Sequence, residues 1–483
     1  MSGDDTSGDG GREEIREDGG GDAGAGTAET GATRGGLRGR AAPYADGIRS
    51  RMTAMPRWKA DAVVVLTTLA LVYVLFVVLS WGQGLDANGT ANTLARLTFL
   101  AAAYALLVLA LNLHWGYAGL FNIGVAGFMS VAVFTLAIVS GGEGVGFGLP
   151  IWAGMIAGML AAAALGAIAA LPALRLRADY FAIVTLGIAE IVRFLMKSQW
   201  LAQHHVFGNE IGLQGSAPVQ VPSAQEYVYK LFTVDGSPRS DPTYLGTQFF
   251  VIGEWFGLER TTVMAWGYAV FVALFVVFAY LLLSRIAYSP FGRILKAIRE
   301  DEGAAQALGK PTSRIKIYSF VLGCAIMGLA GMLWQASRFT VGADAFVPIL
   351  TFYVFVALIV GGSGSNAGSI VGGIAFVGLL LQGPRMLQRV ISEHTDVSST
   401  DTIYEAVTAF ASFDVMPFVG YAIGNIDLLQ RLFVGLVLIV LMLRRPDGIL
   451  GHRKEIAAAT DLSRPAEGRG SGSAATAGGG GDE

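Results

Sequence analysis

The chain has little charge and almost no cysteine. Asp, Glu, Lys and Arg make up 15% of its 483 residues, against about a quarter in soluble domains. The single cysteine, Cys324, excludes an intrachain disulfide and gives no basis for a cysteine-based metal site. Hydrophobic residues make up 53% of the chain, and several apolar runs reach the ~20 residues that span a bilayer. These features predict an all-α polytopic membrane protein.

Residue clusters that support catalysis are also missing. The five histidines are scattered, and the adjacent His204 and His205 have no further ligands at metal-binding spacing. A phosphate-binding loop is excluded because five residues, not four, separate Gly303 from Gly309, and Lys310 is followed by a proline. We therefore predict no catalytic residue, metal site or bound cofactor in this chain, and no nucleic-acid partner.

Two Gly-rich acidic segments, residues 1–55 and 454–483, flank the apolar part of the chain. They have few large apolar side chains to bury, so we expect both to be disordered tails. Between them, residues 56–453 form the expected transmembrane domain. It holds about ten apolar runs, roughly 61–80, 95–113, 117–140, 149–172, 179–198, 262–283, 316–336, 346–362, 367–382 and 427–443. The eighth and ninth runs are short and Gly-rich and could form one re-entrant hairpin, which leaves a range of nine to eleven spans.

The Lys and Arg residues of the short loops indicate the orientation, because cytoplasmic loops are enriched in both. With ten spans, four basic clusters fall on one side, and both termini are then cytoplasmic. The long segments 201–261 and 383–426 then lie outside, and the loop 285–315 lies inside. The clusters are Arg49, Arg51, Arg57 and Lys59; Arg175 and Arg177; Arg285, Arg293, Lys296, Arg299, Lys310, Arg314 and Lys316; and Arg444, Arg445, Arg453 and Lys454.

Three polar residues within or beside the spans are candidates for a solute pathway. Glu190 and Arg193 lie three apart in the fifth run, so they share a helix face and can pair. A charge at the bilayer centre costs about 2.5–3.5 kcal/mol, so either a structural ion pair or a pathway lining would account for them. Asn122, at the turn between the second and third runs, could equally satisfy a helix end or contact solute.

Glycines recur at four-residue steps late in the chain, at Gly364, Gly368 and Gly372. Helices in lipid associate through small residues that let their backbones approach closely. The spacing therefore predicts a tight helix contact. The alternative is that these glycines break a helix and expose carbonyls to a pathway.

A polar stretch from Ile298 to Phe320 interrupts the apolar pattern. Apolar residues at helical spacing over Phe291–Gly309 predict a short amphipathic helix, with Gly309 as its C-cap and Pro311 as its stop. An amphipathic helix between two spans on the cytoplasmic side is suited to docking into a groove of a partner protein. A solvated connector is the alternative.

Five motifs in order resemble the branched-chain amino-acid ABC transporter permease family of the LivM type. They are GYAGLFNIGVAGF (116–128), ADYFAIVTLGIAEIVR (178–193), LKAIREDEGAAQALG (295–309), VGGSGSNAGSIVGG (360–373) and RRPDGILG (444–451). The third resembles the cytoplasmic coupling loop of ABC importers. On this resemblance Glu302, Ala304, Ala305 and Gly309 contact an ATPase subunit. Asn122, Val125 and Ala126 depart from the family's third-span motif, and this puts the usual substrate in question.

The resemblance implies a permease subunit of an ATP-driven importer for branched-chain or other amino acids, in the cytoplasmic membrane. Its implied partners are ABC ATPase subunits, a second permease of the LivH type and an extracytoplasmic solute-binding protein. ATP would be used by the partner subunits alone. Two alternatives stay open: a urea or short-amide permease of the same family, and an ion-coupled secondary transporter. The scarcity of acidic residues within the spans argues against ion coupling.

Overall fold

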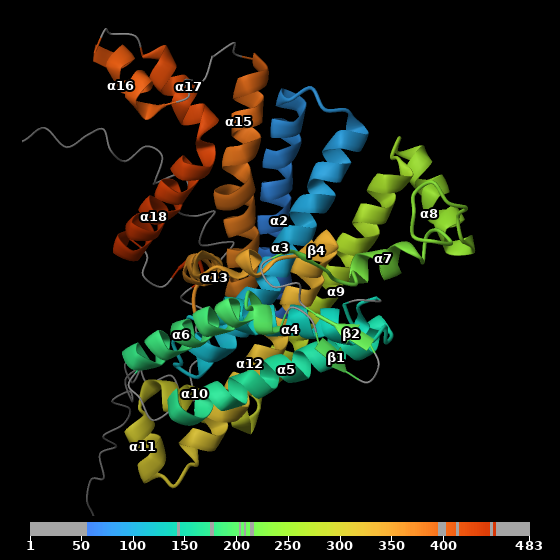
Figure 1. Cartoon of the computed structure of the whole chain (residues 1–483). Coiled ribbons are helices and arrows are strands. Elements are labelled where there is room, and N and C mark those ends of the chain that lie inside the picture. Colours follow the sequence, from blue (N-terminus) through green and yellow to red (C-terminus); the bar gives the residue numbers. More distant parts are fainter. Residues whose placement is uncertain are drawn as a thin grey trace, which may run out of the picture. The chain divides into compact units, whose positions relative to one another are not determined.

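A computed structural model of the chain describes residues 56–142, 145–173, 178–201, 204–206, 209–212, 217–394, 402–411, 415–444 and 448–450. The predicted disordered tails, 1–55 and 454–483, lie outside these residues. The chain divides at Ala60 into two units, and the described part of the first unit is only the start of helix α2. The fold described below is that of the second unit, Asp61–Glu483 (Figure 1).

Each of the ten expected apolar runs contains a helix, which confirms an all-α polytopic membrane protein. These helices are α2 (Arg57–Gly82), α3 (Ala87–Leu111), α4 (Val125–Ser140), α5 (Ile151–Ala173), α6 (Ala178–Met196), α9 (Arg260–Tyr288), α12 (Thr312–Gln335), α13 (Pro348–Gly361), α14 (Asn366–Ala375) and α18 (Ile426–Arg444).

The number of spans and the side of the termini remain predictions. Within the described residues, seven helical stretches are long and apolar enough to cross a membrane. Helix α4, with 16 residues, is shorter. Helix α6 contains three charged residues, Asp179, Glu190 and Arg193. The last candidate is a pair of helices, α17 (Met416–Gly424) and α18, whose axes differ in direction by 83°.

The eighth and ninth runs are longer in the structure than in the sequence pattern. A 3₁₀ turn, η4 (Ala343–Phe346), precedes α13, and α14 continues through the π-helix η5 (Phe376–Gln382) into α15 (Gly383–His394). The two stretches, Ala343–Gly361 and Asn366–His394, are each long enough to span a bilayer alone. In the segment predicted as a long outer loop, 383–426, most of the described residues are helical, in α15, α16 (Ile403–Ala411) and α17.

The remaining connections are short elements. Segment 201–261 contains the end of the 3₁₀ turn η2 (Gln199–Leu201), an antiparallel hairpin of β1 (His204–Val206) and β2 (Asn209–Ile211), strand β3 (Val219–Gln220), and helices α7 (Ala224–Tyr229) and α8 (Tyr244–Trp255). Strand β3 pairs antiparallel with β4 (Thr340–Val341), which follows α12 and the 3₁₀ turn η3 (Ala336–Arg338). A π-helix, η1 (Asn112–Tyr117), extends α3, and segment 285–315 contains α10 (Pro290–Glu300) and α11 (Glu302–Ala307).

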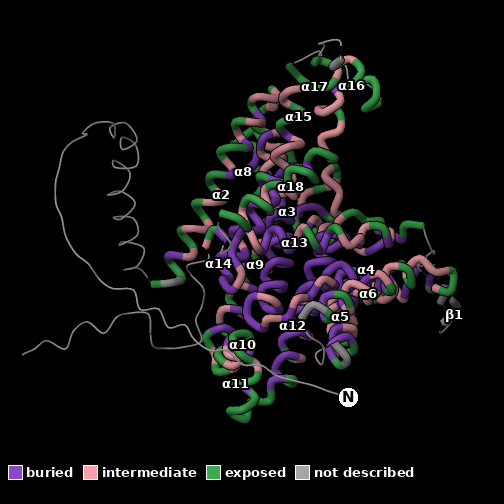
Figure 2. The backbone as a smooth tube through the Cα atoms, turned by 90° about the vertical axis from the view of Figure 1, so that its left-hand side faces the viewer, coloured by how far each residue is buried: buried purple, intermediate pink, exposed green. Residues whose placement is uncertain are grey.

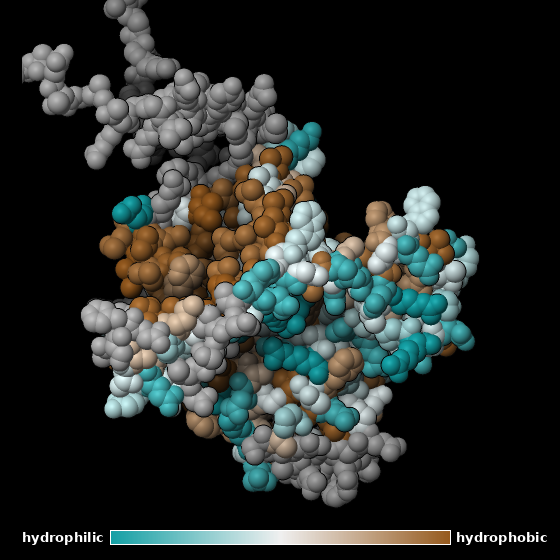
Figure 3. Space-filling view, turned by 90° about the horizontal axis from the view of Figure 1, so that it is seen from above, coloured by the Kyte–Doolittle hydropathy of each residue, from teal (hydrophilic) through white to brown (hydrophobic). Residues whose placement is uncertain are grey.

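Helix α3 forms the centre of the unit. Nearly every residue from Leu97 to Leu111 is buried, and the helix packs against α9, α12, α13 and α14 (Figure 2). By contrast, α2 and α18 carry many exposed Leu and Val side chains, such as Leu71 and Leu436. Seen from above, apolar surface gathers on one side of the molecule and polar surface on the other (Figure 3). An apolar outer surface is expected where helices contact lipid rather than water.

Backbone contacts at glycines hold α13 and α14 together. A Cβ added at Gly372 would lie 2.0 Å from the carbonyl oxygen of Ala357, and one at Gly368 would lie 2.7 Å from that of Gly361. Gly368 and Gly372 therefore lie at a tight helix contact. Gly364 does not belong to this stripe, because α14 begins at Asn366 and Gly364 lies in the preceding turn with φ of 85°.

We expect Gly372→Ala to destabilise the protein. The new methyl group has no room beside the Ala357 carbonyl, and overpacking of this kind costs about 1–3 kcal/mol. Thermal unfolding of the purified protein in detergent should show a lower midpoint. Gly187→Ala in α6 is the control, because nothing lies within 4 Å of a Cβ there. Equal midpoints for the two variants would contradict the tight contact.

Candidate functional site

The segment between α9 and α12 forms two short helices, α10 and α11, where the sequence pattern predicts one. The break is at Asp301, whose φ of −153° and ψ of 105° are extended. Its N–H bonds to the Ala297 carbonyl at 2.9 Å and ends α10. Its carboxylate accepts the Ala304 N–H at 2.9 Å and begins α11. The single-helix prediction is wrong here because an Asp side chain that caps a helix competes with helix continuation.

The end of α11 follows the sequence prediction. Gly309 adopts a φ of 73°, which glycine tolerates without a Cβ clash. The Gly309 N–H bonds to the Gln306 carbonyl at 2.8 Å, and the Lys310 N–H bonds to the Ala305 carbonyl at 3.1 Å. This is the left-handed cap that satisfies the last carbonyls of a helix. The predicted stop at Gly309 is confirmed.

The residues of α11 divide between an inner and an outer face. Ala305 is buried, and Glu302 pairs with Lys316 of α12 at 2.5 Å between Oε2 and Nζ. Gly303, Ala304 and Ala307 are exposed, and Leu308 just beyond the helix is 77% exposed. The outer face therefore consists of small residues beside one projecting apolar side chain, and the exposed Gln306 at its edge donates to Thr312 Oγ1 at 3.0 Å. Helices α10 and α11 lie at the lower end of the molecule in Figures 1 and 2.

Helix α10 is fixed to the bundle by two cations. The Lys296 side chain is buried, and its Nζ lies 5.6 Å from the ring centroid of Tyr117 and 5.5 Å from that of Tyr288. Arg299 donates from Nη1 to the Gly116 carbonyl. A lysine between two aromatic faces gains cation–π attraction that partly offsets its burial. The contact of Lys296 with Tyr117 and that of Arg299 with Gly116 both reach the π-helix η1, so α10 is joined directly to the end of α3.

A second polar cluster centres on Asn112, the first residue of η1. Its side chain is fully buried, accepts the Gly364 N–H at 2.8 Å and donates to Oδ1 of Asn366 at 3.2 Å. Asn366 in turn donates to Ser284 Oγ of α9 at 3.1 Å. These partners fix which way each amide faces. One side chain thereby joins α3 to the turn between α13 and α14, and Asn366 extends the link to α9.

Asn122 belongs to a third buried cluster, with His114. Its Nδ2 donates to His114 Nδ1 at 3.1 Å, and its Oδ1 accepts the Gly124 N–H at 2.8 Å before α4. His114 Nε2 lies 2.9 Å from the Phe320 carbonyl. Because Nδ1 accepts and the carbonyl needs a donor, the ring is neutral with its proton on Nε2. In this structure Asn122 satisfies the start of a helix, and a contact with solute stays a prediction.

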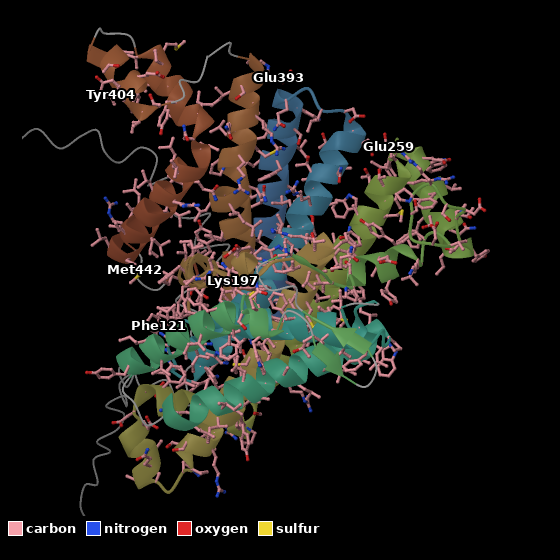
Figure 4. All side chains as sticks on the ribbon, viewed as in Figure 1. Phe121, Lys197, Glu259, Glu393, Tyr404 and Met442 are labelled. Carbon is pink, nitrogen blue, oxygen red and sulfur yellow. The ribbon has the colours of Figure 1, made fainter. Side chains whose placement is uncertain are left out.

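Glu190 and Arg193 form an ion pair. The Arg193 Nη2 lies 2.6 Å from Glu190 Oε2, and Nε donates to both carboxylate oxygens, at 3.0 and 3.2 Å. Arg193 also contacts Asp344 at 3.3 Å, and Lys197 pairs with the same carboxylate. Lys197 lies at the end of α6 (Figure 4). The four charges join α6 to η4, and their role in a pathway stays a prediction.

The structure separates the predicted site residues into different places. Glu302, Ala304, Ala305 and Gly309 lie together on α11 and its cap, whereas Asn122 and the Glu190–Arg193 pair occupy two other clusters. Sequence reasoning did not single out His114, Asn366, or the individual roles of Lys296 and Arg299. In the sequence, Lys296 and Arg299 stand out only as two charges of a basic loop. The tyrosines that enclose Lys296 come from other helices, so spacing along α10 alone does not reveal its burial.

We expect the Glu190–Arg193 pair to couple energetically. Arg193→Gln leaves Glu190 without its ion-pair partner, whereas Glu190→Gln leaves Arg193 with Asp344, so the arginine variant should be the more destabilised. The pair is partly buried, so we expect a cost of about 1–3 kcal/mol. Thermal unfolding midpoints of both single variants and the double variant provide the test. A double variant no better than the worse single one would rule out the coupling.

Comparison with known proteins identifies the family. Residues 93–442 match the model of a family described as branched-chain amino acid transport system / permease component. The LivM permease of Escherichia coli strain K12 is 32% identical over 346 residues, which cover 69% of this chain and 72% of that protein. The LivM permease of Salmonella typhimurium is 30% identical with the same coverage. A shorter match, 33% over 90 residues, is to the LivH permease of Escherichia coli.

No solved structure matches the chain. The sequence match extends from α3 into α18, so it includes α10, α11, the buried clusters of Asn112 and Asn122, and the Glu190–Arg193 pair. The resemblance inferred from five short motifs is therefore confirmed over most of the apolar region. The chain belongs to the branched-chain amino acid transport system permease family and is a multi-pass permease subunit of an ABC importer.

Proposed function

We propose that this chain forms one half of the translocation pathway of an ABC importer in the cytoplasmic membrane. A second permease of the LivH type completes the pathway, two ATPase subunits drive it, and an extracytoplasmic binding protein delivers the solute. The observation that carries this proposal is α11, whose exposed outer face lies between two helices joined to the core of the bundle. The match to LivM permeases supports the set of partners.

The outer face of α11 is the docking surface for an ATPase. Small residues at Gly303, Ala304 and Ala307 let another protein approach the helix closely, and the exposed Leu308 supplies an apolar anchor. Glu302 and Ala305 act from the inner face. The ion pair to Lys316 and the buried methyl group hold α11 against α12. A shift of the docked ATPase then moves α12 with α11.

The same shift reaches the core through α10. Arg299 and Lys296 join α10 to η1, and Asn112 of η1 joins α3 to the turn before α14. Small displacements pass through packed elements because interiors of native density transmit strain. In this proposal, closure of the ATPase pair repositions α3, α12 and α14 together.

ATP is bound by the partner subunits and not by this chain, which therefore needs no cofactor of its own. The Gly309-Lys310 pair resembles the end of a phosphate loop. Both backbone N–H groups are already bonded to carbonyls of α11. A phosphate would have to break the helix cap to reach them. The chain then acts as a transport subunit without catalytic residues.

The solute is a branched-chain amino acid in this proposal, on the strength of the names of the LivM relatives. A urea or short-amide permease is the second candidate, since the chain departs from the LivM pattern around Asn122. An ion-coupled carrier is disfavoured by the match to the permease family. Among the described residues, no Asp or Glu side chain is buried, so a buried carboxylate relay has no support there.

Ala304→Trp is expected to abolish ATPase association and ATP-driven uptake while leaving folding unchanged. The added ring projects from an exposed position and blocks the partner's approach. Co-purification of the ATPase subunits and uptake in proteoliposomes provide the readouts. Ala87→Trp, exposed at the start of α3, is the matched control. Normal association in Ala304→Trp would contradict the docking surface.

A double variant, Glu302→Gln with Gly309→Val, tests the inner face. It removes the charge that holds Lys316 and places a branched residue at a φ of 73°. ATPase association should weaken, and any remaining ATP hydrolysis should no longer depend on solute. Unchanged uptake together with unchanged association would rule out the assignment of α11.

The solute is tested by uptake into proteoliposomes that contain the complete complex and its binding protein. Leucine, isoleucine and valine should accumulate only when ATP is present on the side of the membrane that the ATPase subunits face. Urea and acetamide should not accumulate. Accumulation of urea alone would overturn the amino-acid assignment but keep the importer. Accumulation driven by an ion gradient without ATP would overturn both.

A further inference from the structure

Helix α8 presents three different faces around its axis. Gly246, Phe250 and Gly253 are buried and face the rest of the unit. A Cβ at Gly246 would lie 1.7 Å from the Phe232 carbonyl oxygen, and one at Gly253 would lie 2.5 Å from Val263 Cγ2. The two glycines therefore let the helix lie tightly against its neighbours. This inner face accounts for only part of the apolar surface of α8.

A separate apolar face of α8 is exposed. At 100° per residue, an arc of about 140° contains Tyr244, Leu245, Phe249, Ile252 and Trp255. Each is at least half exposed, and Trp255 reaches 90% and Tyr244 82%. The one polar residue in the arc is Gln248, between Trp255 and Ile252. Contiguous apolar surface of this kind marks contact with a membrane or another protein.

The third face of α8 is polar. Thr247 and Glu254 fall on the opposite side of the helix from the exposed apolar arc and are both exposed. Arg260, just after α8, has its guanidinium 5.3 Å from the ring centroid of Phe250. The inner face is thus flanked by apolar residues on one side and by polar residues on the other. A helix lying in a membrane interface has this division between a lipid side and a water side.

The position of α8 relative to the spans also indicates that it lies at the membrane surface. Four residues after α8, the Glu259 N–H donates to Asn88 Oδ1 in the first turn of α3 at 3.0 Å. Figure 4 shows Glu259 at the upper end of the molecule, near the turn between α2 and α3. Trp81, in the last turn of α2, is 71% exposed at this rim. Tryptophan and tyrosine are enriched at the level of lipid headgroups.

We propose that α8 lies in the plane of the membrane surface and inserts its exposed apolar arc into the lipid. The partner is the bilayer itself. Helix α9 leads directly from α8 into a span, and its exposed Leu274 and Phe278 extend the apolar surface of the chain into the hydrocarbon region. The arc of α8 is the continuation of that lipid contact at the interface. Glu254 and Thr247 then face water, and Arg260 lies among the headgroups.

Single-cysteine spin labelling tests the proposal. Cys324 is buried and is the only cysteine, so Cys324→Ala gives a background for one new cysteine at a time. Leu245→Cys and Ile252→Cys probe the apolar arc, and Thr247→Cys and Glu254→Cys on the same helix are the matched controls. The variant chain is labelled alone and then assembled with its partner subunits in lipid nanodiscs. The assembly is exposed to oxygen, which concentrates in lipid, and to a neutral nickel chelate, which stays in water.

Labels at Leu245 and Ile252 should collide with oxygen several-fold more often than with the nickel chelate, and labels at Thr247 and Glu254 should show the reverse. A higher nickel accessibility at Leu245 and Ile252 would place the arc in water and overturn the proposal. Low accessibility to both reagents would mean that a protein covers the arc, and would also overturn it. Transport by each labelled complex is measured separately. A failure of the importer assignment is thereby distinguished from a failure of the proposal for α8.

Discussion

The end of this fold that carries α10 and α11 depends on the hydrogen bonds of the Asn112 side chain. Between α13 and α14 the backbone leaves the helix, with Gly362 and Gly364 at φ of 104° and 85°. An N–H at such a break finds no water in a membrane interior and costs several kcal/mol if it stays unsatisfied. Asn112 accepts the Gly364 N–H and donates to Asn366. The break can therefore lie within the bundle.

The glycine at position 116 shows how closely that contact is fitted. A Cβ there would lie 1.9 Å from Asn112 Oδ1 and 2.7 Å from the Gly364 nitrogen. The π-helix widens the turn at this place and leaves the Gly116 carbonyl to accept from Arg299. Single-turn π segments are frequent at functional sites. The π-helix η1 therefore contacts the turn between α13 and α14 through Asn112, and α10 through Gly116 and Tyr117.

Much of this architecture could be predicted from the sequence because lipid imposes simple rules. Apolar runs of spanning length located a helix for every expected span, and Gly309 with Pro311 located the end of α11. The break at Asp301 could not be predicted, since Asp tolerates either a helix interior or a cap and the choice depends on packing. Likewise, the placement of Gly364 in a turn depends on the start of α14 at Asn366. The pairing of Glu302 with Lys316 across 14 residues requires the folded turn between α11 and α12.

The division of α11 into two faces would let one short helix serve both folding and the coupling proposed above. Removing Glu302 leaves Lys316, which is only 11% exposed, without its counter-charge, and an uncompensated charge near the membrane is costly. The contacts of Ala304 within α11 are backbone hydrogen bonds, and a change of its side chain leaves them in place. A defect at Ala304 therefore reports on the partner surface, whereas a defect at Glu302 also contains the cost of a loosened α12. A comparison of variants at Ala304 and Glu302 separates docking of the ATPase from transmission of its movement to α12. The two residues lie on different sides of the same helix.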